Sequence, residues 1–282
     1  MKNLVKTLDV ASSFLLPKKS HLFLSTESIS YPRLGTKACQ EFFLSLSQIN
    51  AFFSYVVNMA SHIDYVSEMA EKALTLPNGR RIMLTKDVGK PRPPKIKAID
   101  YLKEKHLQFL LEILIVRLVD NYLNYLASLL FEIFIQRPET LKSSETINLE
   151  TVLSHESIDS LVRAIAERKI EELGYRSFND LSKYFIEKFK LKLCRDEDFP
   201  KLIEAIAVRN ISVHNRCIAN KRFILQTGVD ASWLGRGVEF GLEYIQNNAF
   251  IFANSSKSLD VEARKKLKLK AIRFNVKVNK PM

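Results

Sequence analysis

The chain has 282 residues and a mass of 32.5 kDa, which is enough for one to two domains and a sizeable core. Its 46% hydrophobic and 26% charged residues exclude a disordered chain, and 8 glycines with 9 prolines are too few for the tight turns of a β-sandwich or barrel. An all-α fold is therefore expected. The formal net charge of +12 favours partners that carry phosphate or acidic groups, with nucleic acid first among them.

Cysteine usage and the N-terminus indicate the compartment. Cys39, Cys194 and Cys217 are an odd number, lie far apart and form no CxxC pair, so neither a disulfide framework nor a zinc knuckle is predicted. Asp9 interrupts the first apolar stretch, and two lysines follow Pro17, so no signal peptide is recognisable. We expect a cytoplasmic protein.

Residues 1–95 are predicted to form a mainly helical N-terminal extension whose role the sequence does not reveal. An irregular start ends near Gly35, and a helical run follows over residues 37–76. Residues 42–63 carry no charge, but their serines and amides make a membrane span improbable, so no membrane is expected. Residues 77–97 contain three prolines in GKPRPPK and are predicted to separate the extension from a helical bundle over residues 96–282.

The bundle is predicted to begin with a long helix over residues 98–136. At about 100° per residue its polar side chains share one stripe opposite a leucine and phenylalanine face. Glu112 lies within the apolar arc, where it either pairs with a buried partner, the favoured interpretation, or serves as a carboxylate near a basic cleft. The stripe consists of Arg117, Asp120, Asn121, Asn124, Ser128 and Glu132.

Further helices are predicted over residues 150–173, 178–192, 198–220, 236–254 and 258–270, followed by a basic C-terminal tail. Gly174 is expected at the C′ position of the first of them. The stretch GRGVEFG from Gly235 has the wrong spacing for a dinucleotide fingerprint, and helix packing is the preferred explanation. No P-loop, no GxSxG elbow and no zinc-binding histidine pair occurs, so neither a metal nor a cofactor is expected.

The chemically informative segment is EAIAVRNISVHNRCIANKRF, residues 204–223. On a helical wheel Asn210 and His214 fall in the middle of the apolar face, where an unpaired imidazole or amide would cost a few kcal/mol. Asn210 is four residues before His214, so its amide is expected to contact the imidazole and fix the tautomer. Arg209 borders the same face.

These side chains have the chemistry for RNA cleavage without a metal. A histidine can take a proton from a ribose 2′-hydroxyl, and an arginine can hold the phosphate whose charge grows in the transition state. We therefore assign His214, Arg209 and Asn210 as candidate catalytic residues, and Arg216, Lys221 and Arg222 as candidate RNA contacts. The alternative is that His214 and Asn210 are a satisfied core pair and the arginines face water.

The arrangement Arg209-Asn210-Ile-Ser-Val-His214 has the R-x4-H spacing, with a polar residue after the arginine, and resembles the HEPN superfamily over about residues 98–270. The resemblance implies an all-α bundle and a metal-independent endoribonuclease whose site forms in a homodimer. It assigns His214 as general base, Arg209 as the stabiliser of the phosphorane and Asn210 as an orienting residue. The products would carry 2′,3′-cyclic phosphate and 5′-hydroxyl ends.

Bacterial proteins of this family commonly act as toxins with a cognate antitoxin or as abortive-infection effectors against phage, so RNA and an antitoxin protein are the implied partners. The competing hypothesis is a non-catalytic helical module that binds RNA or a partner protein and keeps the motif as structure. Cleavage that depends on His214 separates the two hypotheses.

Overall fold

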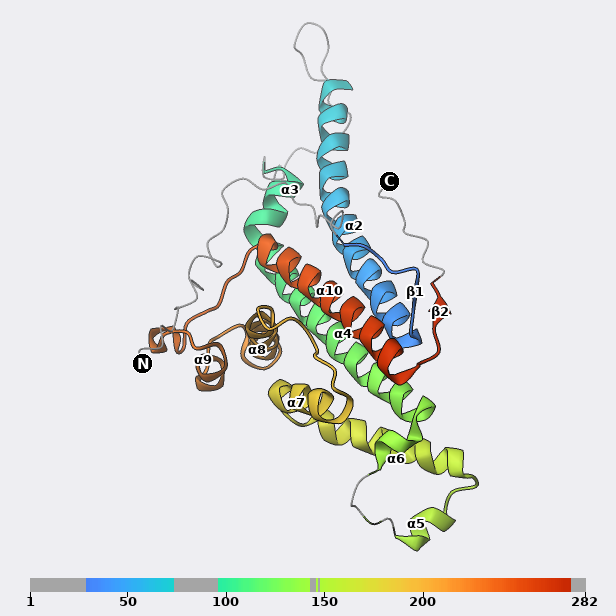
Figure 1. Ribbon diagram of the computed structural model, residues 1–282. Helices are drawn as coiled ribbons and strands as arrows, with labels where there is room; N and C mark the ends of the chain where they lie inside the picture. Colours follow the sequence, from blue (N-terminus) through green and yellow to red (C-terminus); the bar gives the residue numbers. More distant parts are fainter. Residues whose placement is uncertain (1–28, 74–95, 143–145, 147, 275–282) are drawn as a thin grey trace, which may run out of the picture.

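The computed structural model describes residues 29–73, 96–142, 146 and 148–274. In these residues the protein is mostly helical, which confirms the all-α expectation (Figure 1). Two short strands pair antiparallel, Leu34 opposite Arg273. The elements are β1 (Leu34–Gly35), α2 (Lys37–Ala73), α3 (Ala98–Tyr101), a π-helical turn (Leu102–His106), α4 (Leu107–Gln136), a 3-10 turn (Pro138–Leu141), α5 (Leu149–Leu153), α6 (Ile158–Gly174), α7 (Phe178–Phe189), α8 (Phe199–Asn215), α9 (Lys221–Thr227), a 3-10 turn (Ala231–Trp233), α10 (Leu242–Leu267) and β2 (Ile272–Arg273).

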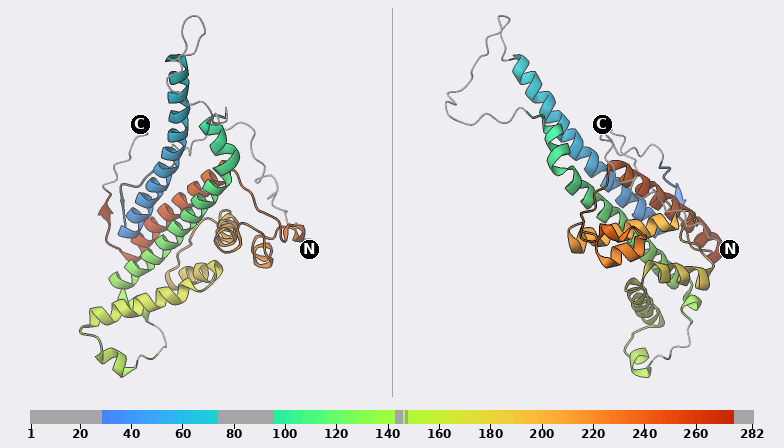
Figure 2. Two further views of the ribbon diagram at one scale, coloured as in Figure 1. Left: turned by 180° about the vertical axis from the view of Figure 1, so that it is seen from behind. Right: turned by 90° about the vertical axis from the view of Figure 1, so that its left-hand side faces the viewer.

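Helix α4 is the centre of the bundle and contacts α2, α6, α8 and α10 (Figure 2). The rings of Tyr122 on α4 and Phe252 on α10 stack with centroids 5.0 Å apart in the core. The predicted polar stripe of α4 is only partly solvated. Arg117 and Asn124 are exposed, but Asn121 is buried and donates to the carbonyl of Phe42 at 3.0 Å. One part of the stripe therefore forms a hydrogen bond to α2, and the other part is exposed to solvent.

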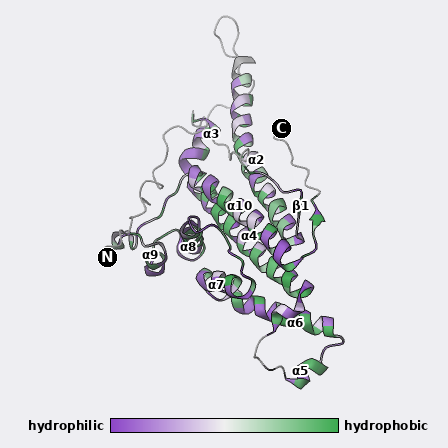
Figure 3. Ribbon diagram, in the orientation of Figure 1, coloured by the Kyte–Doolittle hydropathy of each residue, from purple (hydrophilic) through white to green (hydrophobic). Residues whose placement is uncertain are grey.

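The continuous helical segment Ala98–Gln136 is the one stretch of the described chain that is long and apolar enough to cross a membrane. Of its most apolar window, 56% is buried inside the protein. Figure 3 shows hydrophobic residues along much of α4, which the surrounding helices cover. A core helix that is largely covered by its neighbours passes the same test of length and composition.

The last helix differs from its prediction. Two segments separated near residue 255 were expected, but α10 runs unbroken from Leu242 to Leu267. Ser255 and Ser256 are buried, and the carbonyl of Ser256 accepts a hydrogen bond from the Tyr125 hydroxyl at 2.9 Å. Small side chains let α10 approach α4 closely, so tertiary packing overrides the low helix propensity of serine. Gly174 also differs, because it is the last helical residue of α6 and not its C′ residue.

The helix predicted over residues 198–220 ends early, because α8 stops at Asn215 and α9 begins only at Lys221, after the predicted end. Arg216 and Cys217 both adopt positive φ, 51° and 57°, and the Cys217 amide donates to the carbonyl of Ile211 at 3.1 Å. The chain then pairs with the GRGVEFG segment, because the Val238 amide donates to the Cys217 carbonyl and Ile218 forms a β-bridge to Gly237. The helix-packing explanation for this glycine-rich segment was therefore wrong.

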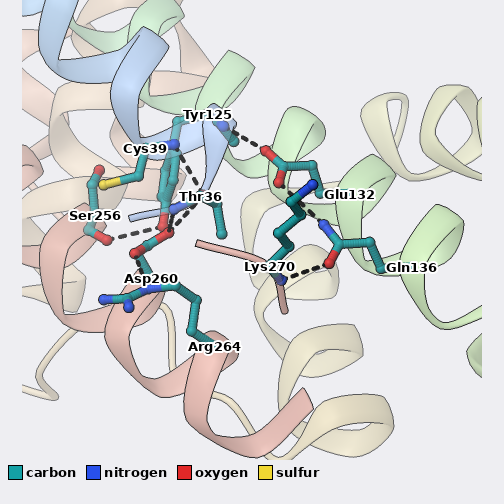
Figure 4. Close-up of polar contacts among 10 residues, drawn as sticks. Thr36, Cys39, Tyr125, Glu132, Gln136, Ser256, Asp260, Arg264 and Lys270 are labelled. Atoms are coloured by element: carbon teal, nitrogen blue, oxygen red, sulfur yellow. Dashed lines mark hydrogen bonds and ion pairs between the residues drawn. The ribbon is translucent and has the colours of Figure 1, made fainter. Parts of the chain in front are cut away.

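A buried polar network joins α2 to α10 (Figure 4). At the start of α2 the Thr36 hydroxyl accepts from the Cys39 amide at 3.1 Å and donates to Asp260 Oδ1 at 2.6 Å. The Thr36 amide also donates to Asp260 Oδ1, at 3.1 Å, and Arg264 donates to Oδ2 at 2.8 Å. Burial raises the pKa of the Cys39 thiol far above its usual range. This cysteine is therefore a packing residue and not a nucleophile.

Glu132 on α4 gives the same end of α2 a second carboxylate. Its Oε1 accepts from the Ala38 amide at 2.5 Å. Burial raises the pKa of Glu132, while hydrogen bonds from backbone amides at the start of α2 oppose that rise. Residues of α2 and α4 also belong to one hydrophobic core. The helices on either side of the predicted boundary at residue 95 therefore pack together, and residues 74–95 lie outside the described part of the chain.

Removing the Asp260 carboxylate is expected to lower the free energy of unfolding by roughly 3 kcal/mol, because a buried ion pair that loses one partner leaves the other uncompensated. Asp260 is 1% exposed and has Thr36 and Arg264 as partners. The control is Glu262→Ala on the same helix, whose exposed ion pair with Lys266 contributes less than about 1 kcal/mol. Urea unfolding of Asp260→Ala and Glu262→Ala measures both. Equal losses of unfolding free energy in the two variants would contradict the stabilising role of the buried Asp260 carboxylate.

Candidate active site

A groove with a volume of about 870 Å³ lies over α4, between α8 with α9 on one side and the α6–α7 connection on the other. Figure 2 shows these elements gathered on the same side of α4. The groove combines an apolar floor with polar and basic walls. Its residues are Leu123, Ala127, Leu130, Ile170, Leu173 to Asn179, Leu181, Ile203, Ile206, Ala207, Arg209 to Ile211, His214, Asn220, Arg222, Phe223, Leu225 and Gln226.

Helix α8 places both of the principal candidate residues in this groove. Arg209 and His214 line it, and Asn210 lies between them. Ala205 and Val208, on other sides of α8, are buried in the core and fix the rotation of the helix. The sequence prediction that R-x4-H presents its two ends to one site is therefore consistent with the structure.

The environment of the polar pair differs from the prediction. Asn210 is half-buried and His214 is exposed, whereas the helical wheel placed both in the middle of the apolar face. A helical wheel identifies a face from the types of residue on it. In the structure, the packing of α8 on α4 and α10 buries an arc of the helix that differs from this predicted face. Both side chains are accessible to water in the groove, so their polar atoms do not require a buried hydrogen-bond partner.

The Arg209 guanidinium is held by a carboxylate of the central helix. Its Nε and Nη2 atoms donate to Asp120 Oδ1 at 2.9 and 2.8 Å, and Nη1 donates to Asn210 Oδ1 at 3.1 Å. Both charged side chains remain partly exposed, 25% for Arg209 and 29% for Asp120. Sequence reasoning missed the role of Asp120, although its place on the polar stripe of α4 was a usable signal. In the described chain Asn210 thus contacts Arg209, and the expected hydrogen bond to His214 is not present.

The predicted RNA contacts are only partly brought together. Arg222 at the start of α9 lines the groove, whereas Arg216 and Lys221 are exposed beside it. The α6–α7 connection adds Arg176, which forms an ion pair with Glu172, a residue outside the groove lining. No pattern in the sequence linked this connection to the R-x4-H segment, because the contact is made across the fold.

Glu112 is half-buried and does not line the groove. It accepts a long hydrogen bond from Gln108 at 3.4 Å and lies near the Cys217 thiol. Burial raises the pKa of Cys217 to about 11, and the hydrogen bond with Ser212 partly opposes this rise. These contacts favour the pairing interpretation of Glu112, and they leave Cys217 a poor nucleophile at neutral pH.

Among the described residues no group of three or more histidine, cysteine, aspartate or glutamate side chains is placed to hold a metal ion. The chemistry that the groove offers is an accessible imidazole, a guanidinium oriented by a carboxylate and two further arginines. These groups suit proton transfer next to a bound phosphate.

Comparisons of the chain with protein-family models, with curated proteins and with solved structures found no match.

Proposed function

We propose that the protein is a metal-independent endoribonuclease of the HEPN type and that the groove over α4 is its active site. The observation that carries this proposal is that Arg209 and His214 line one solvent-accessible groove together with Arg176 and Arg222. The all-α bundle agrees with the fold that the R-x4-H resemblance implies. A chain with a net charge of +12 is also suited to a polyanionic substrate.

In this mechanism the neutral imidazole of His214 removes the proton from a ribose 2′-hydroxyl. The 2′-oxygen attacks the adjacent phosphorus, and the bond from phosphorus to the 5′-oxygen breaks. The leaving oxygen takes up a proton from water, so the products are a 2′,3′-cyclic phosphate and a 5′-hydroxyl end. Arg209 stabilises the charge that gathers on the phosphorane oxygens. Asn210 acts indirectly, through its hydrogen bond to Arg209.

Asp120 orients Arg209 for this task. Two donors of the guanidinium are fixed on one carboxylate oxygen, so the side chain is preorganised before RNA arrives. Preorganised donors stabilise a transition state without the cost of reorienting during the reaction. Arg222, Arg216 and Lys221 hold the backbone of the RNA on either side of the scissile phosphate.

We propose that two copies associate over α8 and α9, where exposed apolar side chains such as Val213 and Leu225 give the partner a surface to bury. The cellular role that fits is a cytoplasmic toxin restrained by an antitoxin protein or an effector of antiphage defence.

The test is cleavage of end-labelled RNA by the purified protein in EDTA. We expect fragments with 2′,3′-cyclic phosphate and 5′-hydroxyl ends, identified by their resistance to phosphatase and by their phosphorylation with polynucleotide kinase. Cleavage that requires a divalent cation, or fragments with 5′-phosphate ends, would contradict the mechanism.

A second candidate function has a specific observation in its favour. The charge of Arg209 is already neutralised by Asp120, as in a purely structural ion pair. A non-catalytic module that binds RNA would retain intact RNA with an affinity that falls steeply as salt rises. Stable RNA complexes without product after prolonged incubation would favour this module.

A further inference from the structure

The outer face of α2 carries a heptad pattern that no described element covers. Positions 52, 55, 59, 62, 66 and 69 follow alternating steps of three and four residues, the spacing of the a and d positions of a coiled coil. Five of the six are large apolar residues that are 42–63% exposed, and the sixth is an exposed histidine. We define them as the α2 stripe: Phe52, Tyr55, Met59, His62, Val66 and Met69.

We propose that the α2 stripe is a self-association surface on which the α2 helix of a second copy of this chain packs as a two-stranded coiled coil. The inward side of the same helix explains why the stripe faces outwards. Phe53, Val57 and Ala60 are buried, and Asp64 accepts hydrogen bonds from the first amides of α3 at 2.6 and 3.0 Å. These residues occupy the b and f positions, which lie away from an a/d seam.

The charge pattern favours a second copy as the occupant. Residues 42–63 carry no formal charge, so two identical helices meet there without the repulsion that a net charge of +12 imposes elsewhere. The flanking e and g positions include Ile63 and Tyr65, which are 51% and 59% exposed and widen the apolar seam. A partner chosen by charge would require charged side chains at these positions.

The exposed apolar area of the seam is close to the area that a specific dimer buries. Large aliphatic and aromatic side chains present about 200 Å² each, so the seven half-exposed apolar residues of the seam offer roughly 700 Å² per copy. A specific dimer of standard size buries about 800 Å² per partner. Because α2 is already a helix in the folded chain, association does not have to repay the cost of forming it.

The position of the stripe makes it accessible and separates it from the groove. Figures 1 and 2 show the C-terminal part of α2 projecting beyond the other helices, at a distance from α8 and α9. Packing through α2 thus leaves the groove open. The proposal is independent of RNA cleavage, because mass in solution reports on it and nuclease activity does not.

The experiment measures the mass of the full-length chain by light scattering at concentrations of about 1 to 100 µM. Val66→Glu and Tyr55→Glu place charge in the seam, and we expect each to halve the mass of the wild-type assembly. Ser61→Glu is the matched control, since it adds the same charge to an exposed c position of the same helix and should leave the mass unchanged. The three substituted side chains, Tyr55, Ser61 and Val66, are exposed in the single chain, so the thermal melting temperatures of the variants should agree with that of the wild type within a few degrees.

Cysteine variants provide a second test of the dimer, in which an intermolecular cross-link is detected and the interface does not have to be broken. Tyr55→Cys alone forms an intermolecular disulfide if the helices run parallel, and Tyr55→Cys combined with Val66→Cys does so if they run antiparallel, because a disulfide requires Cβ atoms about 4 Å apart. Either product supports the proposal. A monomeric wild type, an assembly unaffected by both glutamates, or no cross-link in any variant would overturn it.

Discussion

The His214→Ala variant is expected to cleave RNA about 100 to 10,000 times more slowly than the wild type, the range over which general acid–base catalysis contributes. His214 is the exposed imidazole of the groove and lies in the last turn of α8, so its removal leaves no buried cavity. We expect the free energy of unfolding to change by less than about 0.5 kcal/mol. Single-turnover cleavage with saturating protein measures the chemical step apart from RNA binding.

His106→Ala is the matched control, because His106 is an exposed histidine in the π-helical turn just before α4 and does not line the groove. It should cleave RNA like the wild type. If His214→Ala also retains the wild-type rate, His214 is not the base and the groove binds RNA without the proposed chemistry. If both variants are inactive, the loss has a cause other than the imidazole in the groove.

Removing Arg209 is expected to reduce cleavage about 100- to 1,000-fold, the loss typical of one electrostatic donor in a transition-state site. Because Arg209→Ala also leaves Asp120 without its ion-pair partner, we expect a loss of stability of about 1 kcal/mol for this partly exposed pair. Arg209→Lys keeps the charge but not the fork that reaches both Asp120 and Asn210, and should recover only part of the rate.

The double variant Arg209→Ala with Asp120→Ala separates catalysis from structure. It removes the unpaired carboxylate, so stability should return towards that of the wild type while cleavage stays as slow as in Arg209→Ala. Urea unfolding and single-turnover cleavage measured on the same preparations make this comparison. If cleavage recovered along with stability, Arg209 would be a structural partner of Asp120 and not a group that acts on the phosphate.

Some features of the site could be predicted from the sequence because they depend on local spacing. The spacing of five positions from Arg209 to His214 fixes their relation on one helix wherever that helix packs, and both line the groove. The helix over residues 98–136 was equally predictable, because its leucine-rich periodicity is long and strong. By contrast, the end of α8 depends on positive φ at Arg216 and Cys217, residues for which nothing in the local sequence demands that conformation.

By itself the sequence determined that this protein is all-α and that Arg209 borders the helix face that carries His214, since helical periodicity and composition are local properties. Only the tertiary structure decided which arc of α8 is buried, that Asp120 from a helix 89 residues away holds Arg209, and that Arg176 joins the same groove. The reason is physical. These relations come from how whole helices pack against α4, and a packing angle depends on side chains from several distant segments at once.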